Sequence, residues 1–338
     1  YTALNTLSLH DALPVSALAL SFVEEGTLSL LDPVEKYLPE FSGLRVGREV
    51  GEGIVYEPLK RPLTVYDLLR HTAGLTYGVF FRSPVKGLYL EAGVDRFDLS
   101  REVFLERLAA LPLRFQPGET FEYGLATDLL GHLLEALAGR SLAELLEERL
   151  FRPLGMRDSG FQAKDPARLA QPFPKDPETG HSLRLLPVET PPPRYAGGMG
   201  GVGTAADYLA FLEALRLGRG ALSPTMAGFM VQDHLGSLYP EALKRGPEYL
   251  PGPGYSFGLG VAVRVEPMGY SPGALGEWTW AGFGGTFFFV DPLQEITALY
   301  LAQAPNLLSV LEPEKALHSR LGARLQHAFR TLVYLGLE

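Results

Sequence analysis

The sequence has no cysteine among its 338 residues and only two asparagines. The absence of cysteine excludes disulfides, thiolate metal sites and a cysteine nucleophile, although it leaves the cellular compartment open. The seven histidines form no H-E-x-x-H pattern or comparable pair with carboxylates, so no metal site is expected. Because arginine greatly exceeds lysine while asparagine and cysteine are scarce, the composition indicates a heat-tolerant protein.

The sequence also has no excess of positive charge and no long apolar run. The formal net charge is -9 at pH 7, and no run rich in lysine and arginine interrupts the acidic background. We therefore expect no nucleic-acid partner. No apolar run reaches the length of a membrane span, and the first residues lack the pattern of a signal peptide. With 46% hydrophobic residues, the chain can bury one large core or two closely packed lobes, in an oligomeric state that the sequence does not determine.

Helix signals fill most of the chain, and strand signals cluster near its end. The strand signals are FGLGVAVRVEP, GTFFFVDP and EITALYLAQ, which are rich in β-branched and aromatic residues. The helix signals are an apolar face over 15–26, capping-box starts at Thr64 with Asp67 (ending before Gly74) and at Ser141 with Glu144, a leucine stripe over 125–139, and an amphipathic segment over about 313–334.

This distribution predicts an α+β fold, in which an antiparallel β-sheet is flanked by helices and joined to a helical subdomain. We expect residues 1–60 and 245–338 to form the sheet lobe and residues 61–244 to form the helical lobe. The proline-rich stretch between about 160 and 200 is expected to be a long surface excursion.

Two glycine-rich motifs match known patterns but lack the expected context. GYSFG at 254–258 satisfies G-x-S-x-G, and Asp291 and His318 follow in the chain order of an α/β-hydrolase. A strand signal follows Ser256 where that fold needs a helix, so we interpret the motif as a strand entry. GMGGVG at 198–203 spells the dinucleotide-binding pattern but follows PPPRYAG instead of a strand. Close backbone packing or lining of a cleft is favoured there, and no cofactor is expected.

A third motif, Ser83-Pro84-Val85-Lys86, is a literal Ser-x-x-Lys. On a helix this spacing brings an amine beside a hydroxyl nucleophile. Pro84 and the nearby glycines Gly78 and Gly87 favour a loop, so we interpret the match as a coincidence.

Four segments together resemble the serine β-lactamase-related superfamily, which includes class C β-lactamases, penicillin-binding-type peptidases and family VIII carboxylesterases. Their order, spacing and extent match over nearly the whole chain. In that family the serine of Ser-x-x-Lys attacks a carbonyl, a tyrosine of a second motif acts as base and proton relay, and a third motif on a strand closes the site. The segments are EEGTLSLLDPVEKYLPEF, LTVYDLLRHTAGL, FQPGETFEYGLATDLLGHLLEALAGRSL followed by RPLGM, and GGMGGVGTAADYLAFLEAL leading to WTWAGFGGTFFFVDP.

The resemblance implies that Tyr123 in FEYG is the tyrosine of the second motif. This residue lies immediately before the N-terminus of a predicted helix. There the positive end of the helix dipole and a neighbouring cation would favour the phenolate form. Without the resemblance, a lone tyrosine would be interpreted as a packed core aromatic.

The third motif implied by the resemblance is Trp280-Ala281-Gly282, which would contact the substrate. The backbone N–H of Phe283 is then implied as one donor of the oxyanion hole. Trp280 stands where β-lactamases carry a lysine that holds the substrate carboxylate, and Leu125 stands where class C enzymes have asparagine. Both departures favour the esterase branch, with a small uncharged ester or amide as substrate.

The Ser-x-x-Lys pair should lie just before the helix that begins near Val15. Counting back from Gly26 places it at Leu9 and Ala12, whereas counting from Pro14 places it at His10 and Leu13. Neither register supplies the pair. We therefore expect that residues 1–14 are foreign to a chain whose family strands and nucleophile are missing, and that the chain is inactive as written.

Two other functional hypotheses remain open. The chain is a non-catalytic member of the family that only binds a peptide-like or acyl-like ligand, or it is an α/β-hydrolase that uses Ser256. An ester-cleaving acyl-enzyme mechanism is the hypothesis that the resemblance favours.

Overall fold

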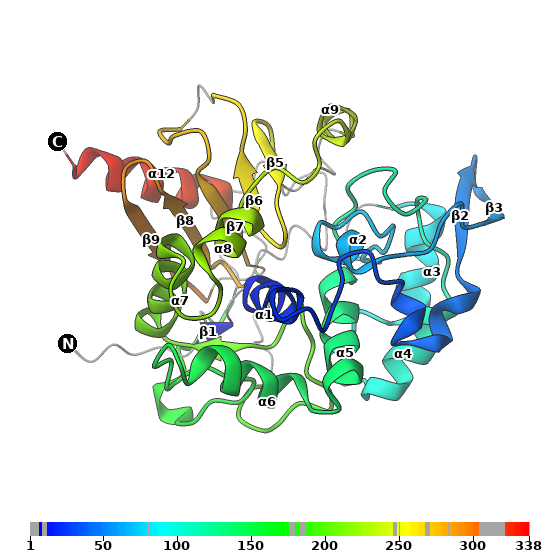
Figure 1. The fold of residues 1–338 in the computed structure, drawn as a ribbon, viewed down its shortest axis with the longest axis horizontal. Coiled ribbons are helices and arrows are strands. Elements are labelled where there is room, and N and C mark those ends of the chain that lie inside the picture. Colours follow the sequence, from blue (N-terminus) through cyan, green and yellow to red (C-terminus); the bar gives the residue numbers. More distant parts are fainter. Residues whose placement is uncertain are drawn as a thin grey trace.

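The computed structural model describes residues 7–8, 12–79, 82–172, 174–175, 180, 182, 187–245, 249, 251–267, 271–282, 284–303 and 322–337. A five-stranded sheet lies on one side of the molecule, and helices fill its centre and its opposite side (Figure 1). The predicted α+β fold is confirmed. The described helices are α1 (Ala12–Glu24), α2 (Val65–Leu69), α3 (Pro84–Ala92), α4 (Arg101–Ala109), α5 (Ala126–Ala138), α6 (Leu142–Leu146), α7 (Ala205–Leu217), α8 (Pro224–Met230), α9 (Leu238–Leu243) and α12 (Gly322–Leu335), with short 3₁₀ turns at Val34–Lys36, Pro39–Gly43 and Pro166–Arg168 and a π turn at Glu147–Phe151.

The main sheet is antiparallel and keeps the order of the chain, so no crossover connection is needed. The segment FGLGVAVRVEP forms a hairpin instead of one strand, because Phe257 pairs with Ala262 across a glycine-containing turn. The strands are β5 (Tyr255–Phe257), β6 (Ala262–Arg264), β7 (Trp278–Ala281), β8 (Phe287–Asp291) and β9 (Ile296–Tyr300); two small ribbons pair β1 (Leu7–Ser8) with β4 (Val202–Gly203) and β2 (Arg45–Val50) with β3 (Gly53–Pro58).

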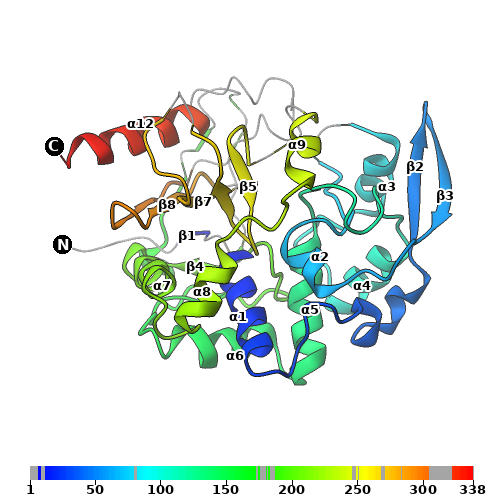
Figure 2. The ribbon, with the colours of Figure 1, turned by 45° about the horizontal axis from the view of Figure 1, so that its top comes forward.

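The three phenylalanines of β8 show that the sheet is covered on both faces. Successive side chains of a strand point to opposite faces. Phe288 therefore joins the main core and contacts Tyr208 of α7, with ring centroids 5.8 Å apart. Phe287 and Phe289 instead contact Phe329 of α12. The sheet thus lies between α12 and α7 (Figure 2).

Helix α1 lies at the centre of the molecule, between the sheet and α5 (Figure 1). The helix predicted from residue 15 begins at Ala12, and every side chain from Ala12 to Leu20 is buried. Its first turn packs against the turn between β5 and β6. A Cβ on Gly260 would lie only 2.2 Å from Oγ of Ser16, so this approach requires glycine.

The predicted helix caps are confirmed at several positions. Both capping boxes form, Thr64 with Asp67 and Ser141 with Glu144, and Gly139 ends α5 in a left-handed conformation. The prediction for the end of α2 was wrong, because the helix stops at Leu69 instead of continuing to Gly74. His71, two residues later, has a φ of +53°, which is incompatible with a continuing right-handed helix.

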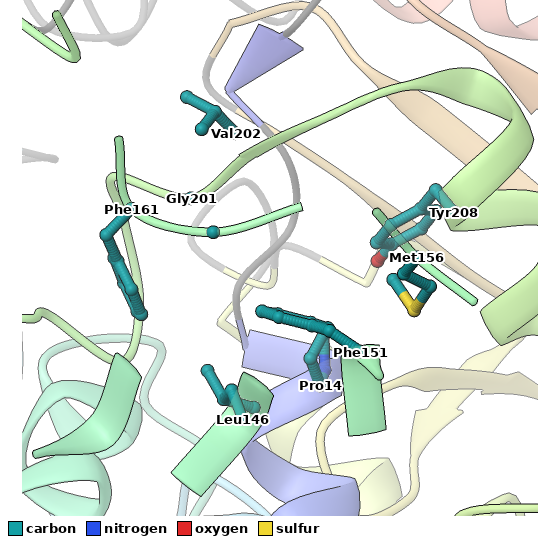
Figure 3. A pocket seen from close by; sticks show the side chains of 9 residues that line it. Pro14, Leu146, Phe151, Met156, Phe161, Gly201, Val202 and Tyr208 are labelled. Atoms are coloured by element: carbon teal, nitrogen blue, oxygen red, sulfur yellow. The ribbon is translucent and has the colours of Figure 1, made fainter. Parts of the chain in front are cut away.

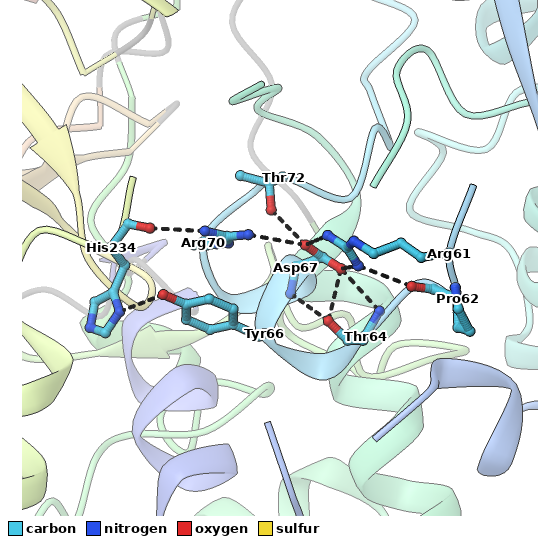
Figure 4. A network of polar contacts seen from close by, with 8 residues as sticks. All are labelled: Arg61, Pro62, Thr64, Tyr66, Asp67, Arg70, Thr72 and His234. Carbon is cyan, nitrogen blue, oxygen red and sulfur yellow. Dashed lines mark hydrogen bonds and ion pairs between the residues drawn. The ribbon is translucent and has the colours of Figure 1, made fainter. Parts of the chain in front are cut away.

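The buried carboxylate of Asp67 fixes the start of α2. It accepts two hydrogen bonds from Arg61, of 2.6 and 2.8 Å, and others from Thr64 and from the hydroxyl of Thr72 at 2.9 Å (Figure 4). Arg70 in turn donates to the carbonyl of His234, 3.0 Å away. Because these bonds reach both ends of α2 and the segment before α9, the loop that follows α2 is held firmly in place.

The two-lobe division at residues 60 and 245 stays a prediction. The β2–β3 ribbon, which the sequence analysis did not identify as strands, contacts α3 and not the main sheet, and α7 packs on β9. The final helix predicted over 313–334 is present as α12; its expected first part lies outside the described residues. None of the described helices combines the length and apolar character needed to cross a bilayer.

Candidate functional site

Tyr123 and Trp280, which the sequence analysis placed in two different motifs, are in contact. Their ring centroids lie 5.3 Å apart, and the ring planes are inclined by 57°. Tyr123 belongs to the segment before α5, whereas Trp280 lies on β7. The rings of His71 and Tyr77, from the loop after α2, lie 4.8 and 5.6 Å from the ring of Tyr123. The site is therefore an aromatic cluster where helix α5, the sheet and this loop meet.

The motif that carries Trp280 ends β7. Trp280 is buried and also contacts Phe257 of β5, with centroids 5.2 Å apart, whereas Ala281 is exposed. Gly282 donates its N–H to the carbonyl of Thr286 at 2.9 Å, which closes the turn into β8. Phe283, the implied oxyanion donor, lies outside the described residues. The substrate contacts implied for Trp280, Ala281 and Gly282 stay predictions.

Burial, and not a nearby cation, dominates the electrostatics of Tyr123. Removal from water raises the pKa of the phenol to about 12, the indole of Trp280 partly offsets this through a hydrogen bond, and the negative charge of Asp128 adds to it. The expectation of a favoured phenolate was wrong for this state of the chain, since the start of α5 alone does not overcome desolvation. Leu125 is the N-cap of α5 and is fully buried.

The residue before Tyr123 anchors a buried cluster of charges. The carboxylate of Glu122 accepts hydrogen bonds from the Thr76 hydroxyl at 2.5 Å and from Arg114 at 3.0 Å, and it pairs with Arg245. Lys86 of α3 places its ammonium group 3.5 Å from the same carboxylate. Burial opposes ionisation of Glu122, but the three cations outweigh it and lower the pKa of the carboxyl. The segments that carry Thr76, Lys86, Arg114 and Arg245 are thereby connected to Glu122, directly before Tyr123.

The literal Ser-x-x-Lys motif starts helix α3 and does not lie in a loop, so that prediction was wrong. Ser83 is the N-cap, and its hydroxyl accepts the N–H of Lys86 at 3.4 Å. Pro84 occupies the first helical turn, where the missing N–H costs nothing. The Lys86 side chain is buried and reaches Glu122. The structure thus gives both residues roles in capping and charge pairing.

Ser256 does not stand on a nucleophile elbow. It is a fully buried residue in the middle of β5, and its hydroxyl donates to Asp233. The antiparallel strand continues through it without turning into a helix, which contradicts the α/β-hydrolase hypothesis. Asp291 accepts a hydrogen bond from Tyr334 at 2.5 Å, and His318 lies outside the described residues.

The glycine directly before the GMGGVG motif packs closely against α5. A Cβ on Gly197 would lie 2.1 Å from the carbonyl oxygen of Thr127, in the first turn of that helix. Within the motif itself, a Cβ on Gly198 would lie 2.5 Å from a carboxylate oxygen of Asp128, and one on Gly200 would lie 2.7 Å from the ring of Phe97, so these two glycines are closely packed as well. The same stretch is tied to α5 by Arg194, which donates to Asp128 at 3.2 Å with both side chains fully buried.

The first turn of α1 faces a small apolar cavity. Its volume of about 20 Å³ has room for roughly one water molecule, which excludes an acyl chain. Leu146 and Phe151 lie beside Pro14, and Val202 of β4 lies farther from it (Figure 3). Residues 9–11, where both registers place the serine, lie outside the described residues, whereas Ala12 and Leu13 are buried.

Sequence reasoning missed His71, Tyr77 and Glu122 as neighbours of Tyr123. The sequence contained one signal, the position of Glu122 directly before the tyrosine, but nothing local identified its partners. Among the described residues, no group of three or more metal-ligating side chains lies close enough together to hold a metal ion.

Comparison with known proteins places this geometry in context. A family model described as Beta-lactamase matches residues 13–318. Esterase EstB from Burkholderia gladioli is 34% identical over 310 residues, covering 85% of this chain and 74% of the esterase. The solved structure of EstCE1, a hydrolase with promiscuous acyltransferase activity, superposes with a TM-score of 0.73 at 29% identity, covering 94% of this chain and 86% of EstCE1.

A second solved structure extends the match to the whole fold. Unliganded simvastatin synthase (LovD) from Aspergillus terreus superposes with a TM-score of 0.77, covering 99% of this chain and 85% of LovD. At 24% identity, this likeness concerns the fold alone.

Proposed function

Since the chain belongs to the β-lactamase family, whose relatives here include hydrolases and acyltransferases, we propose that its site is built for ester cleavage through an acyl-serine. In this mechanism a serine Oγ–carbonyl bond forms, the ester C–O bond breaks, and the proton of the serine passes to the leaving alkoxide. Water then cleaves the acyl-serine by the reverse transfers. Tyr123 is the group that we assign to the proton transfers.

The contact between Tyr123 and Trp280 carries this proposal. It brings the only candidate proton relay of the second motif against the strand of the third motif. Trp280 offers an indole instead of a cation, so the site lacks at this position a charge that would hold an anionic substrate. An uncharged short-chain ester is the substrate class that fits, and two of the relatives, Esterase EstB and Lovastatin esterase, are named as esterases.

The electrostatics of Tyr123 explain why a cation is needed beside it. With a pKa of about 12, the phenol is protonated at neutral pH and is a poor base. A lysine one helical turn after a serine would place an ammonium group beside the phenol and lower that pKa. Residues 9–13 contain neither serine nor lysine. We therefore propose that the chain binds esters but turns them over very slowly.

Installing the pair in each register tests the proposal. The double variants are His10→Ser with Leu13→Lys, and Leu9→Ser with Ala12→Lys; the readout is hydrolysis of p-nitrophenyl butyrate. One register should exceed the unaltered chain by a factor on the order of 10⁴ or more. The inactive register serves as the matched control, because it carries the same two residues shifted by one position. If both folded variants remain as slow as the unaltered chain, the proposal is wrong.

A further inference from the structure

His71 combines contact with Tyr123 and an unusual backbone conformation. Its φ is +53°, a left-handed value that costs energy in any residue with a Cβ. The other described non-glycine residue with a positive φ is Glu295, which is exposed in the turn between β8 and β9. His71, in contrast, is only 1% exposed. Strained residues inside a protein persist when their surroundings determine them, and they concentrate at functional sites.

The strained conformation directs the main chain of His71 toward the segment of Tyr123. The carbonyl oxygen of His71 accepts the N–H of Glu122 at 2.8 Å. Thr72 follows at once and is held by Asp67, through its N–H to the carbonyl oxygen and its hydroxyl to the carboxylate, both at 2.9 Å. A right-handed residue at 71 would continue α2 and turn this carbonyl away from Glu122.

The imidazole ring of His71 covers Tyr123 from the side of the loop. Its centroid lies 4.8 Å from that of Tyr123 and 5.5 Å from that of Phe257. Nε2 lies 3.4 Å from the Thr127 hydroxyl, and Nδ1 has no hydrogen-bond partner among the residues that the structure describes. Burial lowers the pKa of the imidazole to about 3, so the ring is neutral when esters are hydrolysed. A ring with so low a pKa is a weak base, so we assign it no proton transfer.

We propose that His71 is a positioning residue for Tyr123: its ring excludes water from one side of the phenol, and its carbonyl fixes the main chain at Glu122. The inference rests on the proposed role of Tyr123 in proton transfer. Other titratable groups that act on the phenol are Tyr77, in ring contact, and Asp128, whose negative charge opposes phenolate formation. Replacing His71 leaves both groups in place.

The ionisation of Tyr123 tests this role without any turnover. The tyrosinate absorbance is titrated against pH in the parent chain and in each variant, with and without Tyr123→Phe. The difference between the two titrations gives the ionisation of Tyr123. In His71→Asn, which tolerates the left-handed conformation, water reaches the phenol and its pKa falls by about one unit or more toward the ordinary value of about 10. His132→Asn is the matched control, since His132 is also fully buried but its ring packs on Phe104, 5.4 Å away. In that variant the pKa of Tyr123 stays at its original value.

The kinetic readout is measured in whichever of the two Ser-x-x-Lys double variants is active, with and without the substitution of His71. His71→Asn should lower kcat by a factor on the order of 10–100 while KM changes little, because a phenol that is no longer held in place transfers protons less effectively, and this loss outweighs the gain in basicity from its lower pKa. If His71→Asn fails to fold, His71→Gly replaces it, since glycine adopts the same φ without strain. An unchanged pKa of Tyr123 in either folded variant overturns the inference. Failure of both variants to fold, with His132→Asn folded, also overturns it and assigns His71 to stability alone.

Discussion

Lys86 places its ammonium nitrogen 3.5 Å from a carboxylate oxygen of Glu122, the residue directly before Tyr123. Both side chains are buried, and Arg114 and Arg245 approach the same carboxylate. The arrangement supports the interpretation of the literal Ser-x-x-Lys motif at Ser83 as a coincidence. Its lysine is committed to the charge cluster that holds the proposed proton relay in place.

Replacing Glu122 with glutamine should lower the free energy of unfolding strongly. Glutamine keeps the shape but leaves buried cations without their anion, and breaking a buried pair in this way costs about 3–5 kcal/mol. Urea denaturation at neutral pH measures the change. Glu119→Gln is the control, because Glu119 lies nearby but is exposed, and a change of about 0.5 kcal/mol or less is expected there. Equal effects of the two substitutions would contradict a central role for the cluster.

The same carboxylate predicts a pH dependence of stability. Folding lowers the pKa of Glu122 from its ordinary value of 4.5, so the unfolded chain binds this proton more tightly than the folded chain. The contribution of Glu122 is therefore complete above about pH 4.5 and is lost as the pH falls toward the lower folded-state pKa. In urea titrations across the acid range, the gap between the parent and Glu122→Gln should narrow as the pH falls. A gap that stays constant or widens would show that the carboxylate is not held in its ionised form.

Gly197→Ala should destabilise the contact between the glycine-rich segment and α5. The new methyl group would meet a main-chain oxygen 2.1 Å away, which forces a backbone shift that costs about 1–3 kcal/mol. Gly87→Ala is the matched control, because Gly87 lies inside α3 with no atom within 4 Å of the added Cβ. There alanine should stabilise the chain by roughly 0.5–1 kcal/mol. The thermal unfolding midpoint of each variant measures these changes in stability. A Gly197→Ala protein as stable as the parent would contradict the packing described here.

Much of the fold follows from local signals in the sequence. The capping boxes at Thr64 and Ser141, the leucine stripe of α5 and the strand-like run of β8 all predict elements that the structure contains. These signals succeed because each depends on contacts within a few residues or on one periodic face. The end of α2 was mispredicted because the strain at His71 is imposed by distant residues, Glu122 among them.

The site itself was predicted only in part, for a related physical reason. The resemblance implied Tyr123 and Trp280, and the structure places their rings in contact. It did not indicate that burial would raise the pKa of Tyr123, since desolvation depends on neighbours such as His71 and Tyr77 that the linear pattern does not identify. The role of Ser256 was correctly doubted, because the strand signal after it already conflicted with a nucleophile elbow.

The most direct measurement is the turnover of p-nitrophenyl butyrate by the active Ser-x-x-Lys variant with and without Tyr123→Phe. Loss of the phenolic hydroxyl should reduce kcat by a factor on the order of 10²–10⁴, the usual contribution of a general acid–base group. Tyr89→Phe is the control, because it removes a fully buried hydroxyl that donates to the carbonyl of Pro112, at 3.1 Å, and it should leave kcat unchanged. A Tyr123→Phe protein that retains the full rate would contradict the assignment of proton transfer to Tyr123.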